Sequence, residues 1–156
     1  MSAAARVSIS DLLREGSLEQ VPVDPEVVRH LQHQAGNHLR TARAGVGGGD
    51  PEGAFQLAYD ACRKLCMALL LAAGFRPKAD KGHHAVTFEG AGTLAASFGQ
   101  RKIVDEAGDL RYVRNSAEYR AETVDIEDAN DAIAIGEDLL AEFAEPIRKL
   151  LDKATP

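Results

Sequence analysis

Four long segments of this 156-residue chain repeat apolar residues with the period of an α-helix. Two of these segments begin with the same dipeptide, Asp24-Pro25 and Asp50-Pro51, in which aspartate can cap a helix and proline suits its first turn. The segment after Pro25 carries one apolar stripe, formed by Val28, Leu31, Ala35, Leu39 and Ala42. The pattern predicts a surface helix with one buried face, which ends at the glycine-rich stretch GVGGGD.

The segment from Pro51 to about Ala73 becomes apolar on every side toward its end, and Gly74 closes it. We therefore expect it to be the central helix, with Leu57, Ala61, Leu65 and Leu69 in the core together with Val113 and Ala117. Cys62 and Cys66 lie four residues apart on one face of this helix. Such a pair in a reducing compartment is typical of two small core residues rather than of a redox or metal site.

Two more long helices are predicted in the second half of the chain. One covers residues 101–121 and is expected to be interrupted near Gly108. The other begins at Asp125 or Asp128 and is expected to kink at Pro146, because proline removes an intrahelical hydrogen bond.

The N-terminal stretch SISDLLREG predicts a short helix, with Ser8 or Ser10 as its N-cap and Gly16 as its terminator. Only AVTF, at residues 85–88, is typical of a strand. The sequence thus predicts an all-α, up-and-down four-helix bundle with a short extra N-terminal helix. Residues 1–23 form the N-terminal helix and linker, and residues 24–156 form the bundle, within a single domain overall.

Two glycine-rich stretches invite a nucleotide-binding interpretation. The first, GVGGGDPEG, has no Lys-Ser or Lys-Thr after its glycines, so it does not match a P-loop. The second, GAGTLA at residues 90–95, matches the dinucleotide pattern and follows the strand-like AVTF. A dinucleotide-binding fold needs several parallel strands, and the flanking helices leave no room for them.

The formal net charge of the chain is -6, but its middle part is basic. Residues 61–120 contain 10 basic and 6 acidic side chains, whereas residues 121–156 contain 3 and 10. The acidic total argues against strong nonspecific binding to duplex nucleic acid, although it permits a pocket for one phosphate. No apolar run is long enough to span a bilayer, and MSAAARVSIS lacks the apolar region of a signal peptide, so we expect a cytoplasmic protein without membrane contact.

The stretch RYVRNSAEYR, at residues 111–120, gathers three arginines, an asparagine and two tyrosines. His83 and His84 are adjacent, so on a helix they would point about 100° apart and could not easily share a metal ion. The two histidines could instead bind an anion or stabilise a turn. For the arginines, the alternative to a phosphate site is a solvent-exposed helix face without a binding role. His30, His33 and His38 follow helical spacing without an obvious catalytic partner. The candidate phosphate-binding residues are Arg111, Arg114, Asn115, Tyr119, His83 and His84.

Three stretches resemble the HEPN superfamily of small helical bundles: AYDACRKLCMALLLAAGFRP, GHHAVTFEGA and RYVRNSAEYR. The likeness is greatest to an actinobacterial-type branch with an Arg-Asn-x-x-x-Tyr signature. It covers about residues 24–153. Members occur in bacterial toxin-antitoxin and defence systems and beside nucleotidyltransferases.

In catalytic members of that superfamily the signature is an arginine, four residues and a histidine, usually paired across a dimer for metal-free RNA cleavage. The resemblance places Arg114 at the arginine, Asn115 at the polar residue after it, and Tyr119 at the histidine. A tyrosine is almost wholly protonated at pH 7 and is a poor base, but it can donate a hydrogen bond or stack on a base. We therefore expect no catalytic residue in this degenerate signature, and no metal or cofactor.

The resemblance implies a homodimer that binds RNA, a nucleotide or a partner protein, such as a nucleotidyltransferase or antitoxin, without cleaving RNA. One alternative is a metal-independent endoribonuclease in which Tyr119, His83 or His84 replaces the missing histidine. The other is an oligomerising scaffold with no role in nucleic-acid binding, whose arginines only brace the bundle.

Overall fold

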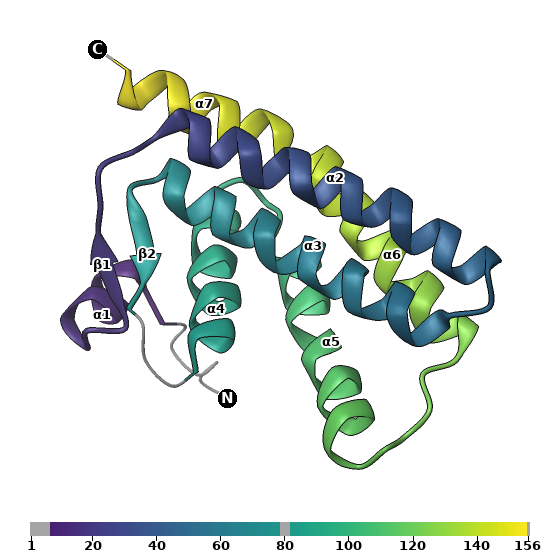
Figure 1. Cartoon of the computed structure of the whole chain (residues 1–156). Coiled ribbons are helices and arrows are strands. Elements are labelled where there is room, and N and C mark those ends of the chain that lie inside the picture. The colour runs from purple at the N-terminus through teal and green to yellow at the C-terminus, as the bar shows by residue number, and fades with distance from the viewer. Residues whose placement is uncertain (1–6, 79–81, 156) are drawn as a thin grey trace.

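The computed structural model describes residues 7–78 and 82–155, and most of them are helical (Figure 1). The helices are α1 (Ile9–Arg14), α2 (Pro25–Gly47), α3 (Pro51–Ala72), α4 (His83–Ala96), α5 (Arg101–Tyr119), α6 (Ile126–Glu142) and α7 (Ala144–Ala154). Two short strands, β1 (Leu18–Gln20) and β2 (Phe75–Pro77), pair antiparallel, with Leu18 opposite Pro77. The predicted all-α bundle with a short extra N-terminal helix is confirmed.

Side-chain caps begin the helices where the sequence predicted them. The Ser8 hydroxyl accepts a hydrogen bond from the backbone N–H of Asp11, which makes Ser8 rather than Ser10 the N-cap of α1. The carboxylates of Asp24, Asp50 and Asp125 cap α2, α3 and α6 in the same way. Each cap satisfies a backbone donor that the first turn of a helix leaves without an intrahelical partner.

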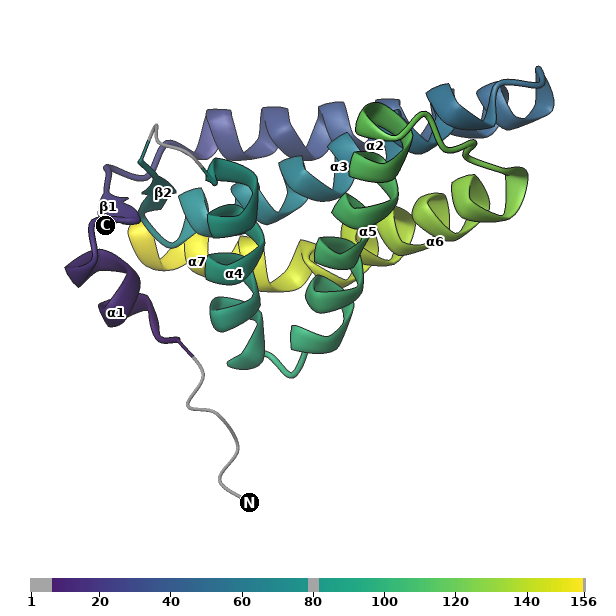
Figure 2. The ribbon, with the colours of Figure 1, turned by 90° about the horizontal axis from the view of Figure 1, so that it is seen from below.

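Helix α3 is the centre of the molecule, because it packs against α2, α4, α5, α6 and α7. The helices α2, α3 and the successive pair α6 and α7 run alongside one another, while α4 and α5 cross α3 steeply (Figures 1 and 2). The core positions predicted on α3 are buried at Ala61, Leu65 and Leu69, and Ala117 of α5 is buried with them. Leu57 and Val113 pack against this core and are partly buried.

The prediction of a strand at residues 85–88 was wrong, because this stretch lies inside α4. The Thr87 hydroxyl donates to the carbonyl of His83, 2.9 Å away, and Thr87 and Phe88 are both buried. Packing of these side chains against α3 and α5 outweighs the strand propensity of the sequence. The GAGTLA stretch belongs to the same helix, so it forms no strand-to-helix turn.

Helix α5 is continuous, so the predicted interruption near Gly108 was also wrong. A Cβ atom at Gly108 would lie 3.4 Å from the Cβ of Phe88 on α4. The glycine therefore allows close packing of α4 against α5 and does not break the helix. Helix α2 likewise continues through Gly47, beyond the start of the glycine-rich stretch that was expected to end it.

The predicted kink at Pro146 appears as a break between α6 and α7 at Phe143, three residues earlier. A proline ring in a helix clashes with the carbonyl four residues before it, which here belongs to Glu142. That carbonyl accepts a hydrogen bond from the Gln100 side chain at 3.0 Å. Proline has no backbone N–H to donate to this carbonyl, so the side chain of Gln100, just before α5, takes its place as the donor.

No helix in the described part of the chain is both long enough and apolar enough to cross a membrane. The expectation that the N-terminus is not an export signal rests largely on residues 1–6, which lie outside the described residues. Cys62 and Cys66 are buried as free thiols, as expected for core residues. Burial raises the pKa of Cys62 to about 12 and that of Cys66 well above its ordinary value, so neither is a reactive thiolate at neutral pH.

Candidate anion-binding site

Helix α3 is apolar along most of its surface but carries four polar residues on one side, at positions i, i+1, i+4 and i+5. These residues contact α2 on one side and α4 and α5 on the other. We call this group and its neighbours the α3 cluster. Its members are Tyr59, Asp60, Arg63 and Lys64 of α3, His38 of α2, His84 of α4, and Arg111 and Arg114 of α5.

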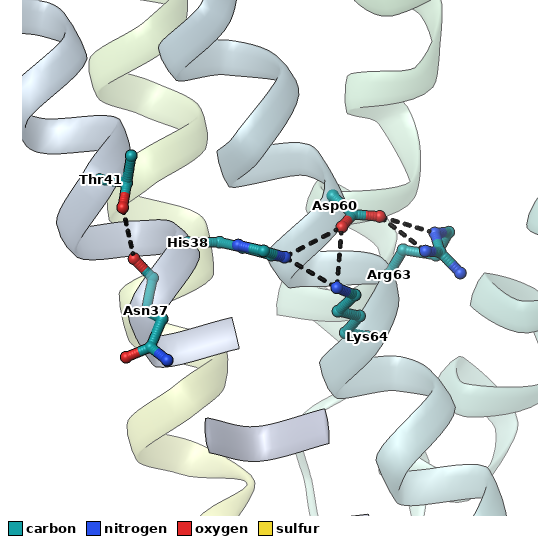
Figure 3. Close-up of polar contacts among 6 residues, drawn as sticks. All are labelled: Asn37, His38, Thr41, Asp60, Arg63 and Lys64. Atoms are coloured by element: carbon teal, nitrogen blue, oxygen red, sulfur yellow. Dashed lines mark hydrogen bonds and ion pairs between the residues drawn. The ribbon is translucent and has the colours of Figure 1, made fainter. Parts of the chain in front are cut away.

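Asp60 connects the cations on its own helix with α2 (Figure 3). Its Oδ1 accepts from Arg63, with Nη2 at 2.6 Å and Nε at 3.1 Å. Its Oδ2 lies 3.3 Å from both Lys64 Nζ and His38 Nε2. Burial alone would raise the pKa of Asp60, but the hydrogen bonds and charges of Arg63 and Lys64 outweigh it and lower that pKa.

His38 is neutral in this arrangement. Its Nε2 lies 2.7 Å from Lys64 Nζ, and an ammonium group has only donors, so the imidazole nitrogen must accept. The proton of the neutral ring is therefore on Nδ1. Burial and the positive charge of Lys64 lower the pKa of His38, with Asp60 acting in the opposite direction. Figure 3 also shows the Thr41 hydroxyl, which donates a hydrogen bond to the backbone carbonyl of Asn37 within α2.

Tyr59 connects α3 with α4 and α5. Its hydroxyl lies 3.3 Å from Nδ1 of His84, and its ring packs against Phe88 with the centroids 5.9 Å apart. The guanidinium carbon of Arg114 lies 5.5 Å from the centre of the same ring, within the range of a cation–π contact. A buried tyrosine thus holds a histidine and an arginine in the same part of the structure.

The electrostatics of this region follow from burial beside several positive charges. Burial raises the pKa of Tyr59, while Arg114, Arg63 and Arg111 oppose the shift. Burial and the charges of Arg63 and Arg114 lower the pKa of His84. Tyr59 is therefore a protonated hydroxyl at neutral pH, and His84 is largely a neutral imidazole. A negatively charged ligand would offset the unfavourable charge around His84.

The six residues predicted from sequence divide into two groups in space. His84 and Arg114 meet at Tyr59, and Arg111 is close enough for its charge to act on that tyrosine. Arg111 also lies over the ring of Tyr112, 5.2 Å from its centre.

The other group lies apart from Tyr59. Asn115 and Tyr119 line a separate hollow of about 460 Å³ on α5, together with Tyr112, Ser116 and Arg120. Tyr119 is 80% exposed. His83 belongs with the first group, because its ring lies beside that of His84, with the centroids 6.3 Å apart.

Sequence reasoning missed Tyr59, Asp60, Arg63 and Lys64 as site residues and named no catalytic partner for His38. A signal was present in AYDACRK, where polar residues recur on one side of a helix that is otherwise apolar. A central helix normally buries such a face, so its polar residues indicate either a paired network or a site. The partners on α2, α4 and α5 are far away in sequence, and only the packing of the helices brings them together.

Among the described residues, no group of three or more His, Cys, Asp or Glu side chains is arranged to hold a metal ion. The α3 cluster instead gathers guanidinium, ammonium and hydroxyl donors, which are the groups that bind phosphate oxygens in proteins. Comparison with protein-family models, curated proteins and solved structures gave no match.

Proposed function

We propose that the chain is an HEPN-like helical bundle that binds the phosphate of RNA or of a nucleotide at the α3 cluster and does not cleave it. One observation carries the proposal: the Arg114 guanidinium lies over Tyr59, whose hydroxyl is within 3.3 Å of His84. This arrangement connects the signature arginine on α5 with a histidine on α4 through a residue of α3. The family resemblance supports Arg114, which it places at the signature arginine.

Binding is better supported than cleavage because the cluster offers more donors than bases. Tyr59 keeps its proton, since burial raises its pKa, and the guanidinium groups of the arginines have donors but no acceptor. Tyr119, at the position of the family histidine, is exposed on a different part of α5. In-line attack by a ribose hydroxyl needs a positioned general base and general acid, whereas binding a phosphate needs only donors. The cluster therefore favours binding over cleavage.

We also propose a cellular setting for the protein, which is the cytoplasm and a toxin-antitoxin or defence-type system. There it would act as a homodimer that contacts a partner protein such as a nucleotidyltransferase or antitoxin. The resemblance to HEPN bundles supports this setting. Three exposed apolar side chains are available for a protein contact: Tyr112 and Tyr119 in the second half of α5 and Ile126 at the start of α6.

The proposal predicts that Arg114→Ala weakens binding of a short single-stranded RNA by about 1.5 to 3 kcal/mol, the range for losing a charged hydrogen bond in a partly shielded site. Fluorescence anisotropy at low salt, in the presence of a chelator, measures this change. Arg114→Lys keeps the charge without the planar fork, so its affinity should lie between those of the native protein and the alanine variant.

Arg148→Ala is the matched control, because Arg148 lies on α7 and pairs with Glu145 and Asp152. It should bind RNA as the native protein does. Circular dichroism of each variant separates loss of binding from loss of folding. If neither RNA nor nucleotides bind the native protein at low salt, where phosphate contacts are least screened, the proposal is wrong and the scaffold alternative replaces it.

A metal-independent endoribonuclease is the second candidate, and the neutral imidazole of His84 beside Arg114 favours it. In this alternative His84 takes the role of the histidine that the signature lacks. We expect the native protein to show no cleavage of single-stranded RNA above background. Cleavage that survives a chelator and disappears in both Arg114→Ala and His84→Gln would establish the nuclease instead.

A further inference from the structure

Lys64 is held away from solvent by two acceptors. Its ammonium lies 2.7 Å from His38 Nε2 and 3.3 Å from Asp60 Oδ2, and only 17% of its side chain is exposed (Figure 3). The contact with His38 exists only while that imidazole is neutral, because a protonated ring has no acceptor nitrogen. The position of Lys64 therefore depends on the protonation state of His38.

Protonation of His38 changes which cation Asp60 binds. The added proton on Nε2 would place two positive groups at 2.7 Å, so Lys64 must move away. The new N–H of His38 already lies 3.3 Å from Asp60 Oδ2 and can donate to it. Arg63 keeps its separate oxygen, Oδ1. His38 thus replaces Lys64 at the carboxylate, and the ammonium is released.

The charged groups around His38 are consistent with this exchange. From α3 it faces Asp60, Arg63 and Lys64, and these are the charges that act on its pKa. Helix α6 also packs against α2. Its Glu137 pairs with Arg43 of α2 and is not among the charges that act on the pKa of His38. Asp60 stays ionised as the pH falls toward mild acid, because its own pKa is lowered, so it is available to accept from His38.

We propose that His38 is a proton-operated switch that holds Lys64 at neutral pH and releases it in mild acid, where its ammonium joins Arg63 in binding a phosphate. This regulatory role rests on the proposed function, since it concerns the same anion site. Arg63 and Lys64 contact the two oxygens of the same carboxylate, Oδ1 and Oδ2 of Asp60, so the ammonium is released close to the arginine. Proton uptake at His38 therefore strengthens anion binding without any change of fold.

The first experiment tests the switch without a ligand. In an NMR pH titration of the native protein, the Cε–Hε signal of Lys64 should shift with the same midpoint as the ring signals of His38. In His38→Gln the amide oxygen accepts from Lys64 at every pH, so this shift should be absent. His33→Gln is the matched control, because His33 is an exposed histidine on the same helix, and the shift should remain. A Lys64 signal that does not follow His38 would overturn the inference.

The second experiment measures the affinity for a short single-stranded RNA between pH 7.5 and 5.5. The native protein and His33→Gln should gain about two- to fivefold more affinity than His38→Gln, the range for one partly exposed ionic contact. Lys64→Met should lose the same extra gain. An equal pH response in all four proteins would overturn the inference while leaving the proposed function intact. Absence of RNA binding at every pH would instead overturn the proposed function, and the Lys64 signal would then decide whether the switch exists.

Discussion

Tyr59 determines the chemistry of the site at the level of single residues. Its ring is buried against Phe88 and its hydroxyl is within hydrogen-bonding distance of His84, so it fixes the position of that imidazole. Because burial raises its pKa, the hydroxyl acts as a neutral donor or acceptor and not as a base. The site therefore combines one rigid aromatic residue with arginines that have longer and more adaptable side chains.

The two histidines of the α3 cluster make folding stability depend on pH. Burial lowers the pKa of both His38 and His84 in the folded state, whereas the unfolded value is near 6.5. As the pH falls below about 6.5, the unfolded state takes up protons more readily, so the free energy of unfolding should decrease until the folded values are passed. Urea unfolding at pH 7.5 and 5.5, followed by circular dichroism, measures the decrease.

His38→Gln should show a smaller decrease than the native protein, because it removes one of the two contributions. His33→Gln, at an exposed site, should behave as the native protein does. An identical pH dependence in His38→Gln and the native protein would show that His38 is not held neutral by the fold.

At the level of helices, the contact of α6 with α2 and α3 depends on Gly136. A Cβ atom at this position would lie 2.6 Å from Leu39 Cδ2 and 3.5 Å from Cys62 Sγ, both in the core. Gly136→Ala should gain up to about 1 kcal/mol in helix propensity but lose about 1 to 3 kcal/mol to overpacking. We therefore expect a net loss of stability in urea unfolding.

Gly47→Ala is the control for that substitution. Gly47 is the last residue of α2, and a Cβ atom added there would meet no other atom within 4 Å, so alanine should be neutral or stabilising by up to about 1 kcal/mol. Equal stability changes in the two variants would mean that Leu39 moves aside freely and that the helices are not packed as tightly as the distances indicate.

The long helices could be predicted because their signals are local: a repeated apolar residue at each turn and, for α2 and α3, an aspartate cap followed by proline. The strand prediction at residues 85–88 failed because Val86, Thr87 and Phe88 favour strands locally, whereas the burial of Thr87 and Phe88 within the helical core decides the outcome. The candidate site was predicted only in part, because its residues can be recognised locally but their contacts depend on tertiary packing. Arg114 and His84 belong to recognisable stretches, but their meeting at Tyr59 depends on how α3, α4 and α5 pack.

At the level of the whole molecule, the apolar side chains Tyr112, Tyr119 and Ile126 are exposed along the second half of α5 and at the start of α6. If α5 mediates the proposed homodimer, these side chains would be buried between two copies, and two anion sites would be related by a two-fold axis. Sedimentation velocity should then detect a dimer, and Ile126→Lys should shift the equilibrium toward monomer. A strict monomer at all working concentrations would contradict the dimer.

The distribution of charge over the whole molecule sets how strongly salt should affect RNA binding. The chain carries a net charge of -6, and residues 121–156 alone contain 10 acidic and 3 basic side chains, so a broad contact with a nucleic-acid backbone is disfavoured. The cations of the α3 cluster, Arg63, Lys64, Arg111 and Arg114, lie on α3 and α5, whereas most of those acidic residues lie on α6 and α7.

Three or four such contacts to a single strand predict a slope of about -2 to -3 in a plot of log affinity against log salt concentration, at about -0.7 for each contact. Anisotropy titrations at several salt concentrations measure the slope, and Arg114→Ala should reduce its magnitude by about 0.7. A slope steeper than about -5 would require more phosphate contacts than the cluster offers and would place RNA on another surface. A flat dependence would mean that the ligand is not held through phosphate at all.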